Sequence, residues 1–91
     1  MSGHSRDLVI VNKRGLHARA SAKFVAAAAE MDGSKVVVAK DGHEALGTSI
    51  LGLMMLGAAK GDTVTLRVEG DAAQERLAEL SALVETGFGE E

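Results

Sequence analysis

The stretch that decides the fold is Ser34-Lys35-Val36-Val37-Val38-Ala39-Lys40-Asp41-Gly42. Its run of β-branched residues predicts a strand over residues 34–40. Asp-Gly directly after such a run is the strongest short signal for a two-residue hairpin turn. A third strand is therefore expected near His43–Leu46, paired with the second. The other predicted elements lie before and after this hairpin in the sequence.

Upstream of the hairpin, the sequence predicts one strand and one helix. Residues 1–6 read as a loose tail, and residues 7–13 are β-branched and apolar enough for a strand. Arg14-Gly15 ends that strand, and an Ala-rich helix is expected from His17 to about Met31. Asp32-Gly33 stops the helix. The residues expected to face the sheet are Ala18, Ala22, Val25 and Ala29.

Downstream, the pattern predicts a short apolar helix over residues 49–56, capped by Ser49 or Thr48. Polar and apolar residues alternate over residues 63–69, which predicts a half-buried strand. Asp71 with Gln74 resembles a capping box before a final amphipathic helix closed by Gly87-Phe88-Gly89. The apolar face of that helix consists of Leu77, Leu80, Leu83 and Val84.

The predicted element order is β-α-β-β-α-β-α. One hairpin joined to helical crossovers indicates an α+β, open-faced sandwich in which three helices cover one face of a four-stranded antiparallel sheet. A chain of 91 residues is expected to form one domain over its whole length.

Composition narrows the function. With 10 basic against 13 acidic residues, two Phe and no Trp or Tyr, the chain is a poor candidate for nucleic-acid binding. It has no cysteine, so disulfides and thiolate metal sites are excluded, and no metal site is expected. Its apolar runs are too short to insert into a membrane and its first residues lack a signal-peptide pattern, so a soluble cytoplasmic protein is expected.

His17 is the side chain best placed for chemistry, because the strand stops at Gly15 and the helix begins at about Ala18. Its imidazole is available as a neutral nucleophile near neutral pH. The first N–H groups of a helix have no intrahelical partner and bind phosphoryl oxygens. Arg19 adds a cation for the same oxygens, and Gly15 permits a close approach of the loop. His4 and His43 are interpreted as ordinary surface residues.

Two segments resemble the signatures of one family. Residues 15–25, Gly-Leu-His-Ala-Arg-Ala-Ser-Ala-Lys-Phe-Val, resemble the active-site segment of HPr, the histidine-containing phosphocarrier of the bacterial phosphotransferase system. Residues 48–62, from Thr48 to Asp62, resemble its second signature. The resemblance runs from about residue 7 to the C-terminus, with the segments in the family's order.

The resemblance implies that Nδ1 of His17 accepts a phosphoryl group from enzyme I, with phosphoenolpyruvate as the original donor, and passes it to an enzyme IIA protein. The supporting groups are Arg19 and the backbone at Ala18, Arg19 and Ala20. Such a protein is a phosphoryl-transfer intermediate rather than an independent turnover enzyme, and it is expected to need no cofactor and to be a monomer. The family normally has proline where this chain has Ala20, so the start of the helix lacks one stiffening element.

Ser49 has two interpretations. It is a helix cap by position. The resemblance adds regulation, because some members are phosphorylated on this serine by an HPr kinase/phosphorylase. Thr48 competes for both roles.

The short helix is apolar nearly all round. Ile50 and Leu53 are expected in the core, while the others suit a docking surface. The predicted docking residues are Leu51, Met54 and Met55, together with Ala20, Ser21 and Phe24 of the first helix. Lys23 and Arg14 are expected on the rim.

Two alternatives stay open at this point. The phosphocarrier hypothesis covers both the sugar branch and the nitrogen-related branch of the system. The other class is a regulatory paralogue that transfers no phosphoryl group and acts through protein binding and Ser49.

Overall fold

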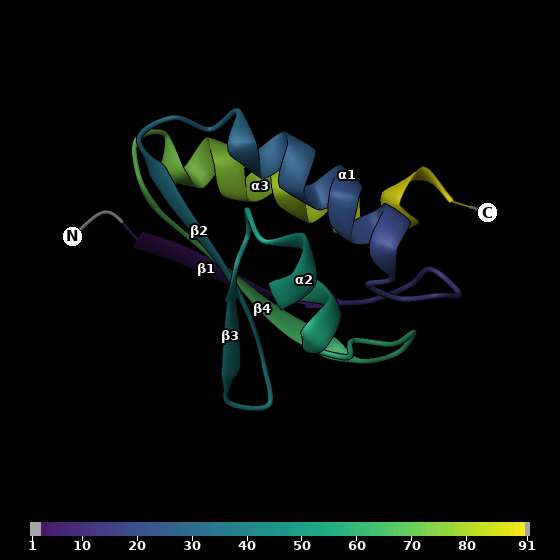
Figure 1. The fold of residues 1–91 in the computed structure, drawn as a ribbon. Coiled ribbons are helices and arrows are strands. Elements are labelled where there is room, and N and C mark those ends of the chain that lie inside the picture. Colours follow the sequence, from purple (N-terminus) through teal and green to yellow (C-terminus); the bar gives the residue numbers. More distant parts are fainter. Residues whose placement is uncertain (1–2, 91) are drawn as a thin grey trace.

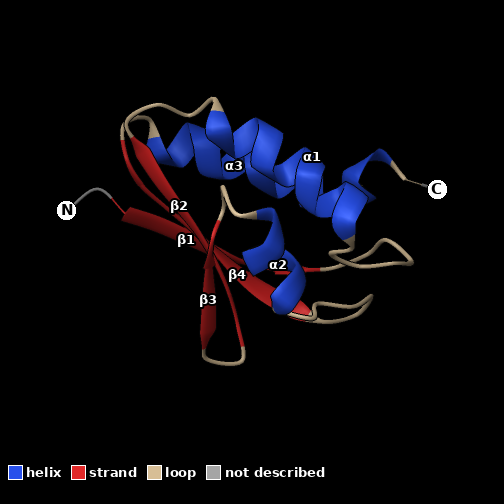
Figure 2. Cartoon of the chain, viewed as in Figure 1, coloured by secondary structure: helices blue, strands red, loops and turns tan. Residues whose placement is uncertain are grey.

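A computed structural model describes residues 3–90 of the chain. It contains a four-stranded sheet in the order β1-β4-β2-β3, in which every neighbouring pair is antiparallel. The helices lie together on one face of this sheet (Figures 1 and 2), so the predicted open-faced α+β sandwich is confirmed. The elements are β1 (Gly3–Val9), α1 (Ala18–Ala29), β2 (Ser34–Lys40), β3 (His43–Leu46), α2 (Ile50–Met55), β4 (Thr63–Gly70), α3 (Ala73–Glu85) and the 3-10 turn η1 (Gly87–Gly89).

The central hairpin forms as the Asp-Gly signal predicts. Asp41 and Gly42 both have positive φ, 52° and 82°, which is the geometry that matches the twist of two flanking strands. Lys40 faces His43 across the turn, and Val38 faces Ala45. The other edge of β2 pairs with β4, so the hairpin is held on a central strand.

The first strand begins earlier than predicted. Residues 3–6 belong to β1, with Gly3 opposite Glu69 and Ser5 opposite Arg67, so the prediction of a loose tail is wrong for them. Residues 1 and 2 lie outside the described part of the chain. Gly-His-Ser-Arg has little strand propensity, but β4 supplies a complete set of backbone partners, and this tertiary pairing overrides propensity. The strand ends at Val9, so the prediction is also wrong for residues 10–13, although the Ile10 N–H still donates to the Asp62 carbonyl just before β4.

The buried face of α1 differs from the predicted one. Its buried residues are Ala20, Ser21, Phe24 and Ala28, whereas Ala18, Ala22 and Ala29 are exposed and Val25 is half-buried. Both sets have helical spacing, and an Ala-rich segment offers several such sets. The ring of Phe24 decides between them, because it is the largest apolar group of the helix and it lies in the core.

The predicted capping box of α3 is absent. The helix begins at Ala73 after Ala72, which has φ 51° and makes no side-chain cap. Asp71 instead joins a backbone cluster: its N–H donates to the Gly33 carbonyl, and its own carbonyl accepts from Ser34 and Arg76. The predicted inner face is otherwise correct, since Leu77, Leu80 and Val84 are buried and Leu83 is partly buried.

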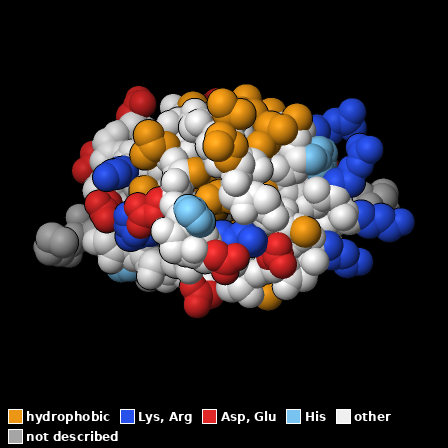
Figure 3. All heavy atoms as spheres, turned by 60° about the horizontal axis from the view of Figure 1, so that its bottom comes forward, with side chains coloured by type: hydrophobic (Ala, Val, Ile, Leu, Met, Phe, Trp, Pro, Cys, Tyr) orange, Lys and Arg blue, Asp and Glu red, His pale blue; other side chains and the backbone are white. Residues whose placement is uncertain are grey.

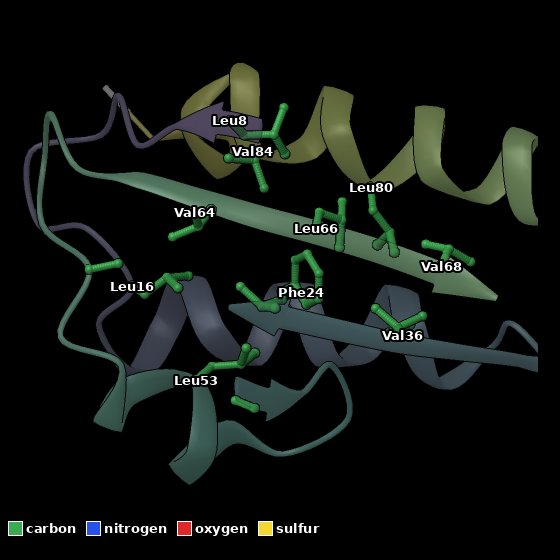
Figure 4. Packing of buried hydrophobic residues seen from close by; sticks show 14 of the residues in the cluster. Leu8, Leu16, Phe24, Val36, Leu53, Val64, Leu66, Val68, Leu80 and Val84 are labelled. Atoms are coloured by element: carbon green, nitrogen blue, oxygen red, sulfur yellow. The ribbon is translucent and has the colours of Figure 1, made fainter. Parts of the chain in front are cut away.

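The core lies between the sheet and the helices (Figure 4). Leu66 and Val68 of β4, Phe24 of α1, Leu53 of α2 and Leu80 of α3 are all buried there. Ile50 is a correction, because 41% of it is exposed and only Leu53 of the two predicted residues is buried. Every helix within residues 3–90 is too short or too polar to cross a membrane.

Candidate functional site

The loop between β1 and α1 is held in place by backbone hydrogen bonds to the loop before β4. The Leu16 N–H donates to the Ala58 carbonyl at 2.9 Å, and the Gly61 N–H donates to the Ile10 carbonyl at 2.8 Å. Gly15 has φ 63° and lies against Ala58 and Ala59, so that a Cβ at this position would collide with the Ala58 carbonyl oxygen. The loop therefore delivers the next two residues to a fixed place.

His17 is the N-cap of α1. Its backbone is extended, with φ −74° and ψ −178°, and its ring atom Nδ1 accepts a hydrogen bond from the Arg19 N–H at 3.2 Å. The imidazole thus occupies the place of the serine or aspartate that usually caps a helix. About a quarter of the side chain is exposed, so the ring is both fixed and accessible.

The first turn of α1 offers backbone donors beside this ring. Ala18, Arg19 and Ala20 are the first three helical residues, whose N–H groups have no partner one turn earlier within the helix. The Arg19 N–H is taken by His17 Nδ1 in this structure. The Arg19 guanidinium makes no ion pair or hydrogen bond with residues 3–90 and is exposed. Backbone donors therefore lie beside Nδ1, and Arg19 adds an exposed cation two residues after His17.

The helix begins at Ala18 as predicted, although alanine stands at position 20. The Ser21 hydroxyl donates to the Leu16 carbonyl at 3.1 Å, and the Ser21 N–H donates to the His17 carbonyl at 2.9 Å. Ser21 is fully buried. The Ser21 hydroxyl thus ties the first helical turn to the preceding loop, one residue after Ala20.

The predicted docking residues divide into two groups. Leu51 and Met55 are 67% and 77% exposed, and Met54 and Ile50 are exposed as well, on the same side of α2. We call these four residues the α2 patch. Figure 3 shows apolar side chains gathered at the top of the view, with Lys and Arg side chains next to them at the right.

Ala20, Ser21 and Phe24 do not belong to such a surface. Their exposed fractions are 0%, 0% and 2%, so they have almost no side-chain area to offer a partner. The prediction of these three as docking residues is corrected: the small and aromatic residues of α1 serve the core. Arg14 and Lys23 are exposed, as predicted for the rim, and the Lys23 ammonium donates to the Phe88 carbonyl at 2.9 Å.

Ser49 rather than Thr48 caps α2. Its hydroxyl oxygen accepts from the Gly52 N–H at 3.0 Å. Thr48 is exposed and lies one residue outside the cap.

Glu90 and Asn12 also belong to the site, although no local sequence pattern marks them. Oε2 of Glu90 lies 2.8 Å from Nε2 of His17, and Oε1 accepts from the Asn12 side-chain amide at 3.0 Å. The same amide donates to the Gly15 carbonyl at 2.9 Å. The sequence feature that indicates an ordered C-terminal segment is Phe88. A large apolar residue just after a helix tends to be buried in the core, which holds the residues next to it in place.

The pKa of Glu90 is lowered from its usual value of 4.5. Partial burial acts the other way and would raise this pKa, but it is outweighed by hydrogen bonds from Asn12 and His17 and by electrostatic attraction to His17 and Lys23. Since the folded-state pKa is depressed, the stabilising contribution of the carboxylate is present above the unfolded value and is lost as the pH falls through the folded one. At neutral pH Glu90 is ionised. Within residues 3–90, no group of His, Asp and Glu is arranged to hold a metal ion.

Comparison with known proteins gives one consistent result. The family model described as "PTS HPr component phosphorylation site" matches residues 4–86. The chain is 46% identical over 85 residues to the phosphocarrier protein HPr of Cupriavidus necator, covering 93% of this chain and 94% of that one. It is 38% identical over 90 residues to the phosphocarrier protein NPr of Shewanella violacea, covering 99% and 98%. The crystal structure of HPr-C-His from Thermoanaerobacter tengcongensis superposes with a TM-score of 0.90 at 41% identity, covering 97% and 98%.

The close contact between Gly15 and the Ala58 carbonyl can be tested by comparing Gly15 with Gly42, because both glycines have positive φ. Gly42 has φ 82° with open space around it, so Gly42→Ala should cost only the left-handed penalty of about 1–2 kcal/mol. Gly15→Ala adds a collision with the Ala58 carbonyl and should cost about 1–3 kcal/mol more. Urea unfolding of both variants measures the difference. Equal losses would show that the loop does not depend on this close approach.

Proposed function

This chain belongs to the HPr family of phosphocarrier proteins, and we propose that His17 is its phosphoryl acceptor. The proposed donor is phosphorylated enzyme I, and the proposed acceptor is an enzyme IIA protein. The observation that carries the proposal is the imidazole at the N-terminus of α1, with Nδ1 facing the first N–H groups of the helix. We also propose, from family membership, that the protein is a monomer and that it acts in the cytoplasm.

The proposed transfer needs no reactant beyond the phosphoryl donor, this chain and the acceptor. The lone pair of Nδ1 attacks phosphorus as the bond between phosphorus and the donor group breaks, and the electron pair of that bond returns to the donor. The Arg19 N–H, released from Nδ1, then donates to a phosphoryl oxygen, together with the N–H groups of Ala18 and Ala20. Arg19 supplies a charge-assisted hydrogen bond. In the second transfer a nucleophilic side chain of the IIA protein attacks phosphorus, the N–P bond breaks, and its electron pair returns to Nδ1.

The grip on the phosphoryl group must stay moderate. A carrier that stabilised the phosphorylated state strongly would slow its discharge, because only interactions that strengthen in the transition state accelerate transfer. The exposed guanidinium and the surface position of the ring fit this requirement. Both partners need to reach the same nitrogen, which suits an open site rather than a deep pocket.

We further propose the α2 patch as the docking surface for these partners. It lies on a helix that packs beside α1, whose first residue follows His17, and it consists of two flexible methionines and two aliphatic side chains. Methionine side chains adapt to differently shaped surfaces. The exposed cations Arg14 and Arg19 border the site and favour an acidic partner.

The chain could serve either the sugar branch or the nitrogen-related branch of the phosphotransferase system. The relatives include proteins named HPr and one named NPr, so both the sugar and the nitrogen-related branch agree with the family. Transfer of the phosphoryl group to a sugar-type or to a nitrogen-type IIA protein distinguishes the two.

Ser49 is the proposed regulatory site, acting through an HPr kinase/phosphorylase. Support comes from its place at the start of the helix that carries the α2 patch. A phosphate there would add a charge of nearly −2 beside an apolar docking surface and oppose binding of an acidic partner. A regulatory paralogue without transfer would show Ser49 phosphorylation but no labelling of His17.

The acceptor assignment predicts the behaviour of His17→Ala. Incubation with enzyme I and phosphoenolpyruvate should add one acid-labile phosphoryl group, about 80 Da, to the natural chain and none to the variant. His43→Ala, which changes an exposed histidine beside the hairpin turn, is the matched control and should be labelled normally. Intact-mass spectrometry at alkaline pH reads both. Labelling of His17→Ala would refute the assignment.

The docking assignment predicts that Leu51→Glu weakens binding to enzyme I by about tenfold or more, equivalent to about 1.4 kcal/mol, with an unchanged melting temperature. Val9→Glu is the control, because Val9 is exposed on the strand β1 and outside the patch. Phe24→Ala should instead lose about 3–5 kcal/mol of stability, since Phe24 is core. Unchanged binding by Leu51→Glu would remove the patch from the proposal.

The regulatory assignment separates the cap from the charge. Ser49→Ala removes the hydroxyl that accepts from Gly52 and should cost about 1 kcal/mol of stability, with normal acceptance of the phosphoryl group. Ser49→Asp keeps a capping oxygen and adds a negative charge, so it should slow acceptance from enzyme I. If Ser49→Asp and Ser49→Ala react equally fast, charge at this position does not regulate docking.

A further inference from the structure

The imidazole of His17 is held from both nitrogens. Nδ1 faces the Arg19 N–H at 3.2 Å, and Nε2 lies 2.8 Å from Oε2 of Glu90. The two contacts come from opposite ends of the chain, since 73 positions separate the histidine from the glutamate. The family match ends at residue 86, so Glu90 lies beyond the segment that identifies the family.

Each contact specifies the position of the ring proton. A backbone N–H only donates, so Nδ1 must be unprotonated to accept from Arg19. An ionised carboxylate only accepts, so Nε2 must carry the proton that it donates to Glu90. An imidazole without these partners exchanges between its two neutral tautomers, and the other tautomer would set N–H against N–H at Arg19.

The geometry points to Glu90 as a positioning residue that fixes the Nε2–H tautomer of His17 and so leaves Nδ1 free to accept the phosphoryl group. The relevance to transfer rests on the proposed function. The placement of the proton does not, because it concerns the free protein.

The segment that carries Glu90 is held firmly. Phe88 is buried, with 1% exposed, and it adopts a left-handed conformation with φ 58° between two glycines that also have positive φ. Lys23 of α1 donates to its carbonyl, and the Glu90 N–H donates to the Gly87 carbonyl at 3.0 Å. Asn12 then binds the second carboxylate oxygen and connects it to the Gly15 carbonyl. Glu90 is thereby fixed with respect to the same loop that places His17.

The carboxylate also has a part in discharge. When the N–P bond breaks, its electron pair returns to Nδ1, and the leaving group is a neutral imidazole only if Nε2 still carries its proton. If Nε2 were deprotonated, the leaving group would be an imidazolate anion, which departs far less readily. By accepting from Nε2–H, Glu90 favours the neutral nucleophile in the first transfer and keeps the better leaving group in the second.

Nitrogen NMR of the free protein tests the placement directly. In a ¹⁵N-labelled sample at pH 8, where Glu90 is ionised, the Nε2 of His17 should resonate as a protonated nitrogen and Nδ1 as an unprotonated one. In Glu90→Ala the two signals should move toward each other as the tautomers mix. Glu90→Gln retains an oxygen that accepts from Nε2–H and should restore most of the separation. Glu85→Ala, which removes an exposed carboxylate at the end of α3, is the control and should leave both signals unchanged.

Transfer kinetics provide the second readout. Glu90→Ala should slow phosphorylation of His17 by enzyme I and discharge to a IIA protein by about tenfold or more, as for other carboxylates that orient a reactive histidine. Identical ¹⁵N signals in Glu90→Ala and the natural chain would overturn the assignment, and so would unaltered rates. If the natural chain itself accepts no phosphoryl group, the proposed function fails, while the NMR result still decides where Glu90 holds the proton.

Discussion

The hydrogen bond from the Arg19 N–H to Nδ1 of His17 is the interaction on which the site depends. It makes one side chain both the cap of α1 and the proposed acceptor of the phosphoryl group. The helix needs a cap acceptor at this position, and a neutral Nδ1 supplies it. When phosphoryl oxygens replace the ring nitrogen, the same N–H group keeps an acceptor, so the helix end stays satisfied in both states. Loading and unloading therefore require little change in the fold.

This hydrogen bond depends on contacts that hold the loop, the first turn of α1 and the imidazole ring in place. Gly15 lets the loop lie against the Ala58 carbonyl, and Ser21 fixes the first helical turn to Leu16. On the other side of the ring, Glu90 is anchored through Asn12 and through the buried ring of Phe88. The site is thus assembled from both ends of the chain, and α1 stands between them.

Most of the fold was predictable from the sequence, since the hairpin, the crossover helices and the central strand all have strong local signals. The errors share one physical cause, which is tertiary contact without a local pattern. Residues 3–6 form a strand because β4 offers an unpaired edge, and an Ala-rich helix could not indicate which face Phe24 would bury. The predicted positions of His17 and Ser49 at helix N-termini are confirmed, because a helix cap has a local sequence pattern. Glu90 was missed because its partner lies 73 positions away.

The most direct test is a ¹⁵N spectrum of the His17 imidazole before and after phosphorylation by enzyme I and phosphoenolpyruvate. A phosphoryl group on Nδ1 should shift that nitrogen and couple it to phosphorus, while Nε2 remains protonated beside Glu90. Coupling of phosphorus to Nε2, or a phosphorylated chain in which both His17 nitrogens are unchanged, would contradict the assignment of His17 Nδ1 as the carrier atom.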